Sequence, residues 1–257
     1  MGQHSKIDWC DATWNPVTGC LHGCEYCYAR KIANRFAGED GDGSIHELDK
    51  RMFVQHRNDD GEWNREYKCA YPYSFDPTLH RYQLDEPQKW KKPKTIFVCS
   101  MADLFGEWVP DEWIKEVFEA CEKAPWHRYI FLTKNPKRYF ALINDGILKK
   151  HDNWWLGSTI DNRDAGRFQA WGYNSFTSIE PLTEYLDVGL SSFGRDKWVI
   201  IGAETGNRKG KIIPKREWVD NIVDAAAITQ MKVFMKESIR ELMGDDFKQE
   251  FPWEVKK

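Results

Sequence analysis

Short apolar runs alternate with amphipathic segments along most of this chain. The apolar runs are rich in β-branched and aromatic side chains and predict buried strands. They lie at residues 13–17, 95–99, 129–132, 154–159, 175–179, 198–202 and 232–235. Near-continuous apolar strands are typical of a parallel sheet that is covered on both faces.

The amphipathic segments predict helices between these strands. Apolar residues share one face in residues 28–36 and again in residues 111–123, where Pro110 precedes the first turn. Pro136 opens another helix, and residues 215–227 form a further one. Strands and helices that alternate in this way predict an α/β fold, a parallel (β/α) partial TIM-like barrel with six to seven strands. An open doubly wound sheet is the alternative.

Residues 38–92 interrupt the alternation of predicted strands and helices. They are rich in glycine, aspartate, proline and tyrosine, and they show only weak periodicity. We predict an irregular insertion after the first helix, in the role of a lid. The rest of the chain shows no boundary, so residues 1–257 are expected to form one barrel domain.

Composition and charge limit the class of protein. Apolar residues make up 41% of the 257, and no apolar run is long enough to span a membrane. No apolar run follows Met1, so no secretory signal is expected and the protein is predicted to be cytoplasmic. The formal charge of −3 argues against a protein that coats nucleic acid. The basic stretches 89–94 and 208–211 suit phosphate groups, or else form a solvated surface.

Three of the seven cysteines, Cys20, Cys24 and Cys27, lie within eight residues of a loop between a predicted strand and a predicted helix. Without an export signal, thiols or metal ligands are favoured over disulfides. A four-iron cluster takes four ligands, so three thiolates leave one iron open to a small molecule. Zinc bound with the help of His22 or Cys10 is the alternative, but structural zinc ligands usually come in two separated pairs and a second pair is missing.

The cysteine spacing, together with Tyr26 just before the last cysteine, resembles the signature of the radical S-adenosylmethionine (SAM) superfamily. Further blocks are similar to a phage-associated family of radical-SAM-like proteins. These blocks are residues 7–20, 100–105, 132–134, 155–162, 178–182 and 202–206. The resemblance implies a 4Fe-4S cluster on Cys20, Cys24 and Cys27, whose open iron chelates SAM. Reductive cleavage of SAM then produces a 5′-deoxyadenosyl radical, which abstracts hydrogen from a substrate.

The resemblance also implies a set of residues that bind SAM. The end of the second strand would receive the amino group, the end of the fourth strand would meet the ribose hydroxyls, and the tyrosine would pack near the adenine. The residues expected in these roles are Tyr26, Ser100, Asp103, Ser158, Asp161 and Asn162. For the two aspartates, a helix cap or a loop carboxylate is the structural alternative.

Charged residues at the ends of later strands are the candidates for substrate chemistry. Glu180, Glu204 and Lys236 are expected as catalytic residues across the barrel from the cluster. Lys134, with Arg138 four residues further on, would bind a phosphate or a carboxylate. Salt bridges among these same residues are the alternative.

The four remaining cysteines do not have the spacing of a second cluster. Cys99 and Cys121 fall on apolar faces and are predicted to be packed thiols. Cys10 and Cys69 form at most one pair, which is too few ligands for an auxiliary cluster, although Cys10 would suit a radical relay.

These features predict a radical SAM enzyme that acts as an isomerase, a lyase or a transferase. The expected substrate is a nucleotide or a modified base in DNA, because the similar family is phage-associated, basic patches are present, and 13 tryptophans offer surfaces for stacking. A small metabolite is another substrate class. The non-catalytic alternative is a nucleic-acid-binding protein stabilised by zinc or by a cluster. Such an enzyme also needs an electron donor, expected to be a reductase or a flavodoxin-type protein.

Overall fold

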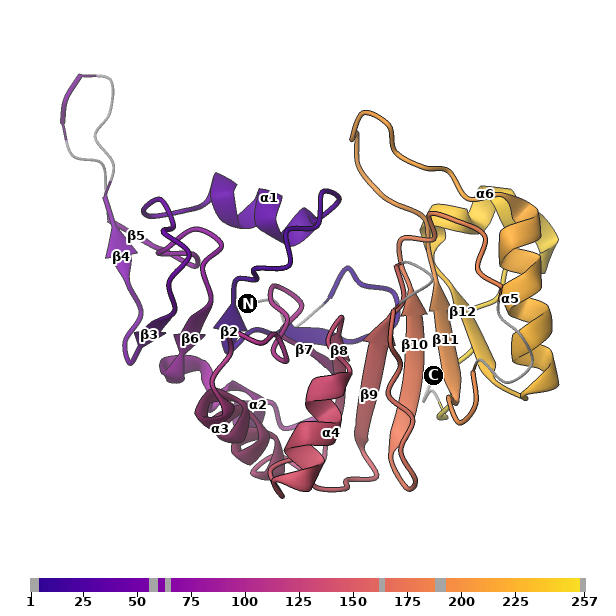
Figure 1. Ribbon diagram of the computed structural model, residues 1–257. Coiled ribbons are helices and arrows are strands. Elements are labelled where there is room, and N and C mark those ends of the chain that lie inside the picture. The colour runs from indigo at the N-terminus through magenta and orange to yellow at the C-terminus, as the bar shows by residue number, and fades with distance from the viewer. Residues whose placement is uncertain (1–4, 56–59, 63–65, 162–164, 188–192, 255–257) are drawn as a thin grey trace.

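Seven parallel strands form one curled half-barrel sheet in the computed structural model (Figure 1). The structure describes residues 5–55, 60–62, 66–161, 165–187 and 193–254. The strands pair in chain order, as β1 (Ala12–Trp14), β7 (Thr95–Val98), β8 (Arg128–Thr133), β9 (Trp154–Thr159), β10 (Asn174–Ile179), β11 (Trp198–Ile201) and β12 (Lys232–Met235). A doubly wound sheet reverses its strand order at a switch point. This sheet has no such reversal, so the parallel partial barrel is confirmed and the doubly wound alternative is wrong.

Three of the predicted helices connect neighbouring strands. α3 (Asp111–Glu122) joins β7 to β8, α4 (Lys137–Asn144) joins β8 to β9, and α5 (Arg216–Ile228) joins β11 to β12. Asp111 and Glu112 place negative charge in the first turn of α3, where the helix dipole favours it. After β12 the described chain contains η2 (Glu237–Ile239), α6 (Arg240–Met243) and η3 (Gly244–Asp246). None of the described helices is both long and apolar enough to cross a membrane.

Side chains alternate between the two faces of the large sheet, because successive residues of a strand point to opposite sides. On the helix-covered face, Ile96, Tyr129 and Phe131 pack in one core with Val117 and Phe118 of α3. The opposite face carries a second apolar layer, formed by Trp9, Phe97, Ile130, Trp155, Phe176, Trp198, Ile200 and Phe234. Full burial of one such side chain stabilises the fold by roughly 1.5–3 kcal/mol.

The segment predicted as one strand over residues 13–17 is split in two. β1 ends before Asn15, and β2 (Val17–Thr18) belongs to a different sheet. Pro16 explains the break, since it has no N–H to donate to a strand ladder. The side-chain oxygen of Asn15 accepts a hydrogen bond from the backbone N–H of Met101 at 3.0 Å. The break therefore turns the chain away from the large sheet.

The insertion contains more regular structure than its weak periodicity indicated. β6 (Thr78–His80) pairs with β2 and with β3 (His46–Leu48), and β4 (Phe53–Val54) pairs with β5 (Tyr67–Lys68). Strands of two or three residues are too short to show a period of two. In Figure 1, β4 and β5 project away from the large sheet. The role of a lid stays a prediction.

The last part of the insertion belongs to the main core. Leu79 is fully buried there, and the indole N–H of Trp14 donates to the carbonyl oxygen of Gln83 at 2.9 Å. The turn η1 (Arg81–Gln83) and the short helix α2 (Glu86–Lys89) then lead to β7. This part was expected to be irregular, but long-range packing orders it.

β2 leads the chain directly into the cysteine loop, which we define as residues 19–27. Gly19 has a φ of 87°, and a Cβ atom there would lie 2.1 Å from the carbonyl oxygen of Asp76. Only glycine fits this position. The backbone N–H of Cys20 donates to the carbonyl oxygen of Phe75 at 3.0 Å. The insertion therefore supports the start of the cysteine loop.

Asp196 is a buried acid beside β10. Its Oδ2 accepts a hydrogen bond from the hydroxyl of Thr177 at 2.5 Å. Burial raises the pKa of Asp196 from 3.8 to about 6. In the unfolded chain the same carboxyl ionises at a lower pH. Above about pH 6 the folded protein therefore carries a buried negative charge that costs stability.

We expect Asp196→Asn to stabilise the protein at about pH 7.5 and to have little effect at about pH 4. The folded pKa lies above the unfolded one, so the contribution of Asp196 to stability falls as the pH rises from about 4 to about 6. A difference of two pKa units corresponds to roughly 3 kcal/mol in the free energy of unfolding. Urea unfolding at both pH values measures the gain, with the exposed Asp187→Asn as the control. An equal gain at both pH values would contradict this expectation.

Candidate functional site

The cysteine loop carries three free and partly exposed thiols, those of Cys20, Cys24 and Cys27. The loop ends where α1 (Tyr28–Arg35) begins. Cys27 is the N-cap residue of this helix, and its Sγ accepts a hydrogen bond from the backbone N–H of Arg30 at 3.4 Å. The start of the helix therefore orients the last cysteine.

The other cysteines lie apart from the loop thiols. Cys99 and Cys121 are buried free thiols of the main core, as predicted. Cys69 is buried within the insertion, and Cys10 packs against the apolar layer opposite the helices. The described structure contains no disulfide among the seven cysteines.

The three sulfur atoms of the loop do not form a tight triangle. Within the described part of the chain, only Asp42, His46 and Asp76 bring three potential metal-ligand atoms within 4.8 Å of one another. Sulfurs bound to one tetrahedral zinc ion lie about 3.8 Å apart, because each Zn–S bond is about 2.3 Å long. The loop thiols are therefore more widely spread than a closed zinc site requires.

The thiol of Cys20 is held in its neutral form by its surroundings. Burial raises its pKa to about 12, and the nearby carboxylate of Asp103 adds to this effect. A metal cation favours the thiolate and reverses the balance. A bound cation would therefore favour ionisation of the Cys20 thiol.

Asp103 joins the cysteine loop to the ends of β7 and β8. Its buried carboxylate pairs with His22 Nε2 at 2.7 Å and accepts from the backbone N–H of Lys134 at 2.9 Å. The backbone N–H of Phe105 donates to its other oxygen at 3.0 Å. Asp103 was expected to accept from the ammonium group of SAM. These three contacts position the cysteine loop, and since a carboxylate has about four acceptor positions, the role of Asp103 toward SAM stays a prediction.

Tyr26 forms a second connection, to the ends of β8 and β9. Its hydroxyl donates to Asp161 Oδ2 at 2.7 Å and accepts from Lys134 Nζ at 2.6 Å. Lys134 and Asp161 also form an ion pair. Burial raises the pKa of Asp161, but the hydrogen bonds from Lys134 and Tyr26 outweigh it and lower that pKa below its usual value. Two residues predicted for the SAM site, Tyr26 and Asp161, are thus brought together.

Ser100 and Tyr28 form a third connection. The hydroxyl of Tyr28 donates to the carbonyl oxygen of Ser100 at 2.8 Å, and the hydroxyl of Ser100 donates to Asn15 Oδ1 at 3.1 Å. Ser100 therefore lies beside the loop, and its role in binding SAM stays a prediction. Tyr28 is 51% exposed and was not predicted as a site residue. The signal was its place directly after Cys27, at the first residue of a helix.

Glu180 and Lys236 meet at the ends of β10 and β12. Lys236 Nζ lies 2.5 Å from Glu180 Oε1, and the side chains of Lys236 and Glu180 are 19% and 27% exposed. Gly202, which follows β11, lies between them. A Cβ atom there would lie 3.1 Å from Lys236 Cδ and 3.3 Å from Glu180 Cγ. The absence of a side chain at position 202 lets the two charges meet, a role that sequence reasoning missed.

Glu204 forms a different ion pair. Its side chain is 2% exposed, and its two oxygens accept from Arg208 Nε and Nη2, both at 2.7 Å. Arg208 Nη1 also lies 3.4 Å from the carboxylate of Glu25 in the cysteine loop. The salt-bridge alternative therefore describes Glu204, which holds the segment after β11 beside the cysteine loop.

Two predicted residues lie elsewhere, and a third is outside the described residues. Ser158 belongs to the helix-covered face, where its buried hydroxyl oxygen accepts from the backbone N–H of Phe168 at 2.8 Å. Arg138 pairs with Asp111 at 2.5 Å rather than joining the strand-end charges. A shift of one position along a strand is enough to change the face. Asn162 lies outside the part of the chain that the structure describes.

A family model matches residues 4–243, and its description is Protein of unknown function (DUF5131). The chain belongs to this family. The matched region contains the cysteine loop and all seven strands of the half barrel. No curated protein and no solved structure matches the chain.

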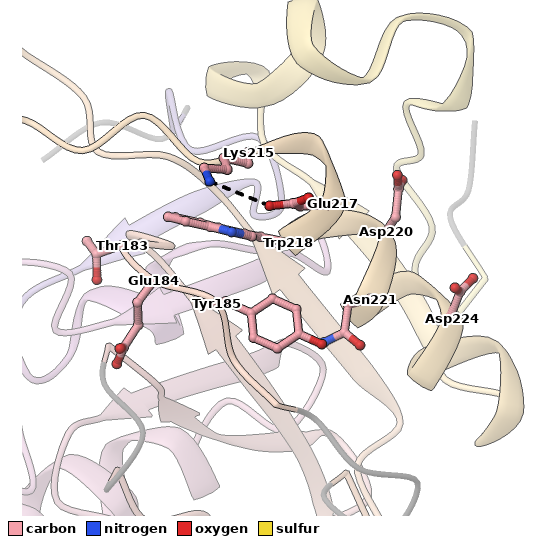
Figure 2. Close-up of a pocket in the computed structure, with 9 residues that line it drawn as sticks. All are labelled: Thr183, Glu184, Tyr185, Lys215, Glu217, Trp218, Asp220, Asn221 and Asp224. Carbon is pink, nitrogen blue, oxygen red and sulfur yellow. Dashed lines mark ion pairs between the residues drawn. The ribbon is translucent and has the colours of Figure 1, made fainter.

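A pocket of about 780 Å³ lies between the segment after β10 and α5 (Figure 2). Tyr185 and Trp218 line it, together with more acidic side chains than basic ones. Lys215 Nζ lies 3.6 Å from the carboxylate of Glu217 at its rim. The pocket shares no lining residue with the strand-end charges or the cysteine loop, but its Thr183 donates to the carbonyl oxygen of Asp161 at 3.4 Å.

We expect Gly157→Ala to destabilise the protein by roughly 1–3 kcal/mol, because the added Cβ would lie 2.2 Å from the ring of Phe176. Gly202→Ala is the matched control. Its Cβ would meet the flexible side chain of Lys236 at 3.1 Å, so a smaller loss is expected. Urea unfolding of both variants measures the difference. Equal losses would show that Gly157 and Gly202 do not face their neighbours as described.

Proposed function

We propose that this DUF5131 protein is a radical SAM enzyme that holds a 4Fe-4S cluster on Cys20, Cys24 and Cys27. One observation supports this most strongly. The three thiols are free and partly exposed on one loop, and side-chain contacts attach that loop to the strand ends where two ion pairs also lie. Enzymes with parallel barrels place their chemistry at the carboxyl ends of the strands.

The proposal includes a partial TIM-like barrel. The chain order of the seven parallel strands supports this assignment, as does the packing of α3, α4 and α5 on one face of the sheet. The apolar layer on the opposite face would then form the interior of the barrel.

The donor set suits an iron–sulfur cluster better than zinc. A cubane binds each thiolate on a different iron, so its ligands are farther apart than those of a single zinc ion. The spread of the loop sulfurs agrees with this. His22, one alternative zinc ligand, is paired with Asp103. When bound, a cluster with an open iron would bind SAM and supply the electron that cleaves it to a 5′-deoxyadenosyl radical.

The residues of this chain would orient the cofactor. Tyr26 is fixed through its hydroxyl, so its ring is held beside the last cysteine, where adenine is expected to pack. Asp161 stays ionised beside Lys134, which suits a carboxylate that accepts from a ribose hydroxyl. Groups that are already in place need no reorganisation when a ligand binds.

The Glu180–Lys236 ion pair is the proposed substrate-binding group. Both side chains are partly exposed at the strand ends, and no other expected catalytic residue shares this position, because Glu204 is committed to Arg208. The carboxylate would accept a proton or a hydrogen bond from the substrate, and the ammonium would stabilise negative charge.

Exposed basic residues support a nucleotide or a modified base in DNA as the substrate. Lys31 and Arg35 on α1, and Lys209 and Lys211 on the segment after β11, are exposed. Arg208 connects this segment to the cysteine loop. Such residues neutralise phosphate groups, and a base inside a duplex would have to flip out to reach the strand ends.

A reductase or a flavodoxin-type protein is the proposed electron donor.

Anaerobic reconstitution tests the cluster. We expect about four iron and four sulfide per chain, and loss of most iron in Cys24→Ala. Cys121→Ala is the control, because this thiol is buried in the main core. After reduction, wild type and the control should release 5′-deoxyadenosine and methionine from SAM, whereas Cys24→Ala should not. Stoichiometric zinc without sulfide would instead support the non-catalytic alternative.

We expect Glu180→Gln to separate substrate chemistry from SAM cleavage. The variant should release 5′-deoxyadenosine within about twofold of wild type but lose about 10²-fold in substrate conversion, because it removes the proton acceptor. Conversion is followed as a nucleoside difference between cells that contain wild type or variant. Glu204→Gln should lose less, since Glu204 contacts Arg208. Loss of SAM cleavage in Glu180→Gln would place this residue in the cofactor site, and normal conversion would make the ion pair structural.

A further inference from the structure

A second group of potential metal ligands lies in the insertion. Asp42, His46 and Asp76 each offer one ligand atom, and these atoms all lie within 4.8 Å of one another. His46 is the first residue of β3, and Asp76 precedes β6 by two residues. None of the three takes part in the proposed radical chemistry.

Asp76 is a buried carboxylate without a lysine or arginine partner. Its side chain is 9% exposed, and within the described ranges no lysine or arginine nitrogen lies within 4.0 Å of it. The backbone N–H groups of Asp42 and Gly43 donate to it at 2.8 Å and 3.1 Å, and His46 Nε2 lies 3.5 Å away. Buried charges in proteins are usually paired or coordinate a metal. The backbone donors are neutral, so among the described residues only a protonated His46 would bring a cation to this charge.

His46 is held with Nε2 near this carboxylate. Its ring stacks on Tyr73, with the centroids 3.8 Å apart and an interplanar angle of 14°. Asp42 lies on the same turn, where its Oδ1 accepts from the backbone N–H of Ser44 at 2.9 Å. The stacking fixes the orientation of an imidazole nitrogen, which is the usual histidine ligand for a metal.

We propose that Asp42, His46 and Asp76 bind one divalent cation. One imidazole with two carboxylates suits Zn²⁺ or Mn²⁺, and water would complete the coordination. The cation would neutralise the buried charge of Asp76.

The position of the group gives this cation a structural role. It would join the turn at residues 42–46 to Asp76, whose carbonyl oxygen approaches Gly19 too closely for any side chain there. The carbonyl oxygen of the neighbouring Phe75 accepts a hydrogen bond from the backbone N–H of Cys20. The cation would therefore stabilise the segment that supports the cysteine loop. This inference does not depend on the proposed function, because it requires neither a cluster nor SAM.

Manganese titration of the full-length, chelator-treated protein tests the site. Mn²⁺ is the probe because oxygen ligands suit it and thiolates select other metals. We expect the electron paramagnetic resonance signal of free Mn²⁺ to fall until about one ion is bound per chain, with a rise in Tm. Cys24→Ala should bind Mn²⁺ as wild type does, which distinguishes this site from the cysteine loop.

His46→Ala and Asp42→Asn should each weaken Mn²⁺ binding by about tenfold or more. Asp42 is exposed, so its variant stays informative even if the histidine variant unfolds. His151→Ala is the matched control, because His151 also stacks on an aromatic ring and lies 3.4 Å from the carboxylate of Glu122. No bound Mn²⁺ in wild type, unchanged binding in both ligand variants, or loss of binding in Cys24→Ala would each overturn the inference.

Discussion

The parallel pairing of seven strands in chain order is the constraint on which the rest of the structure depends. Because all strands run in one direction, their carboxyl ends reach the same edge, and each following loop brings its side chains there. Lys134 and Asp161 meet at this edge, as do Glu180 and Lys236, although the partners are far apart in the chain. Because successive residues of each strand point to opposite faces, a second apolar layer forms on the face opposite α3, α4 and α5.

The cysteine loop takes its shape from this edge. Contacts from His22, Tyr26 and Tyr28 reach the ends of β7, β8 and β9, and Arg208 reaches the loop from the segment after β11. Fixing a loop costs about 1–2 kcal/mol of conformational entropy per residue, and these contacts offset part of that cost. A loop that is ordered in advance loses less freedom when it binds a ligand. The thiol-bearing loop and the charged strand ends are therefore one connected structure.

The insertion contributes to this structure from the other side. β6 pairs with β2 just before the loop, and the backbone around Asp76 leaves room only for glycine at position 19. Asp76 thus combines two tasks, since its carbonyl group borders the cysteine loop while its carboxylate holds the turn that contains Asp42. The insertion was predicted to be irregular because its periodicity is weak. It nevertheless supports the candidate site.

Local patterns in the sequence were sufficient to predict the parallel sheet, its connecting helices and the buried state of Cys99 and Cys121, because apolar periodicity reports directly on burial. The strand over residues 154–159 has the predicted bounds. The same patterns identified Glu180 and Lys236, but their ion pair across Gly202 depends on the register of three strands. Ser158 was chosen for its place near a strand end, yet alternation turns it to the helix-covered face. Asp103 binds His22 across 81 residues of chain. Such long-range contacts depend on how complete elements pack, and a local pattern does not contain that information.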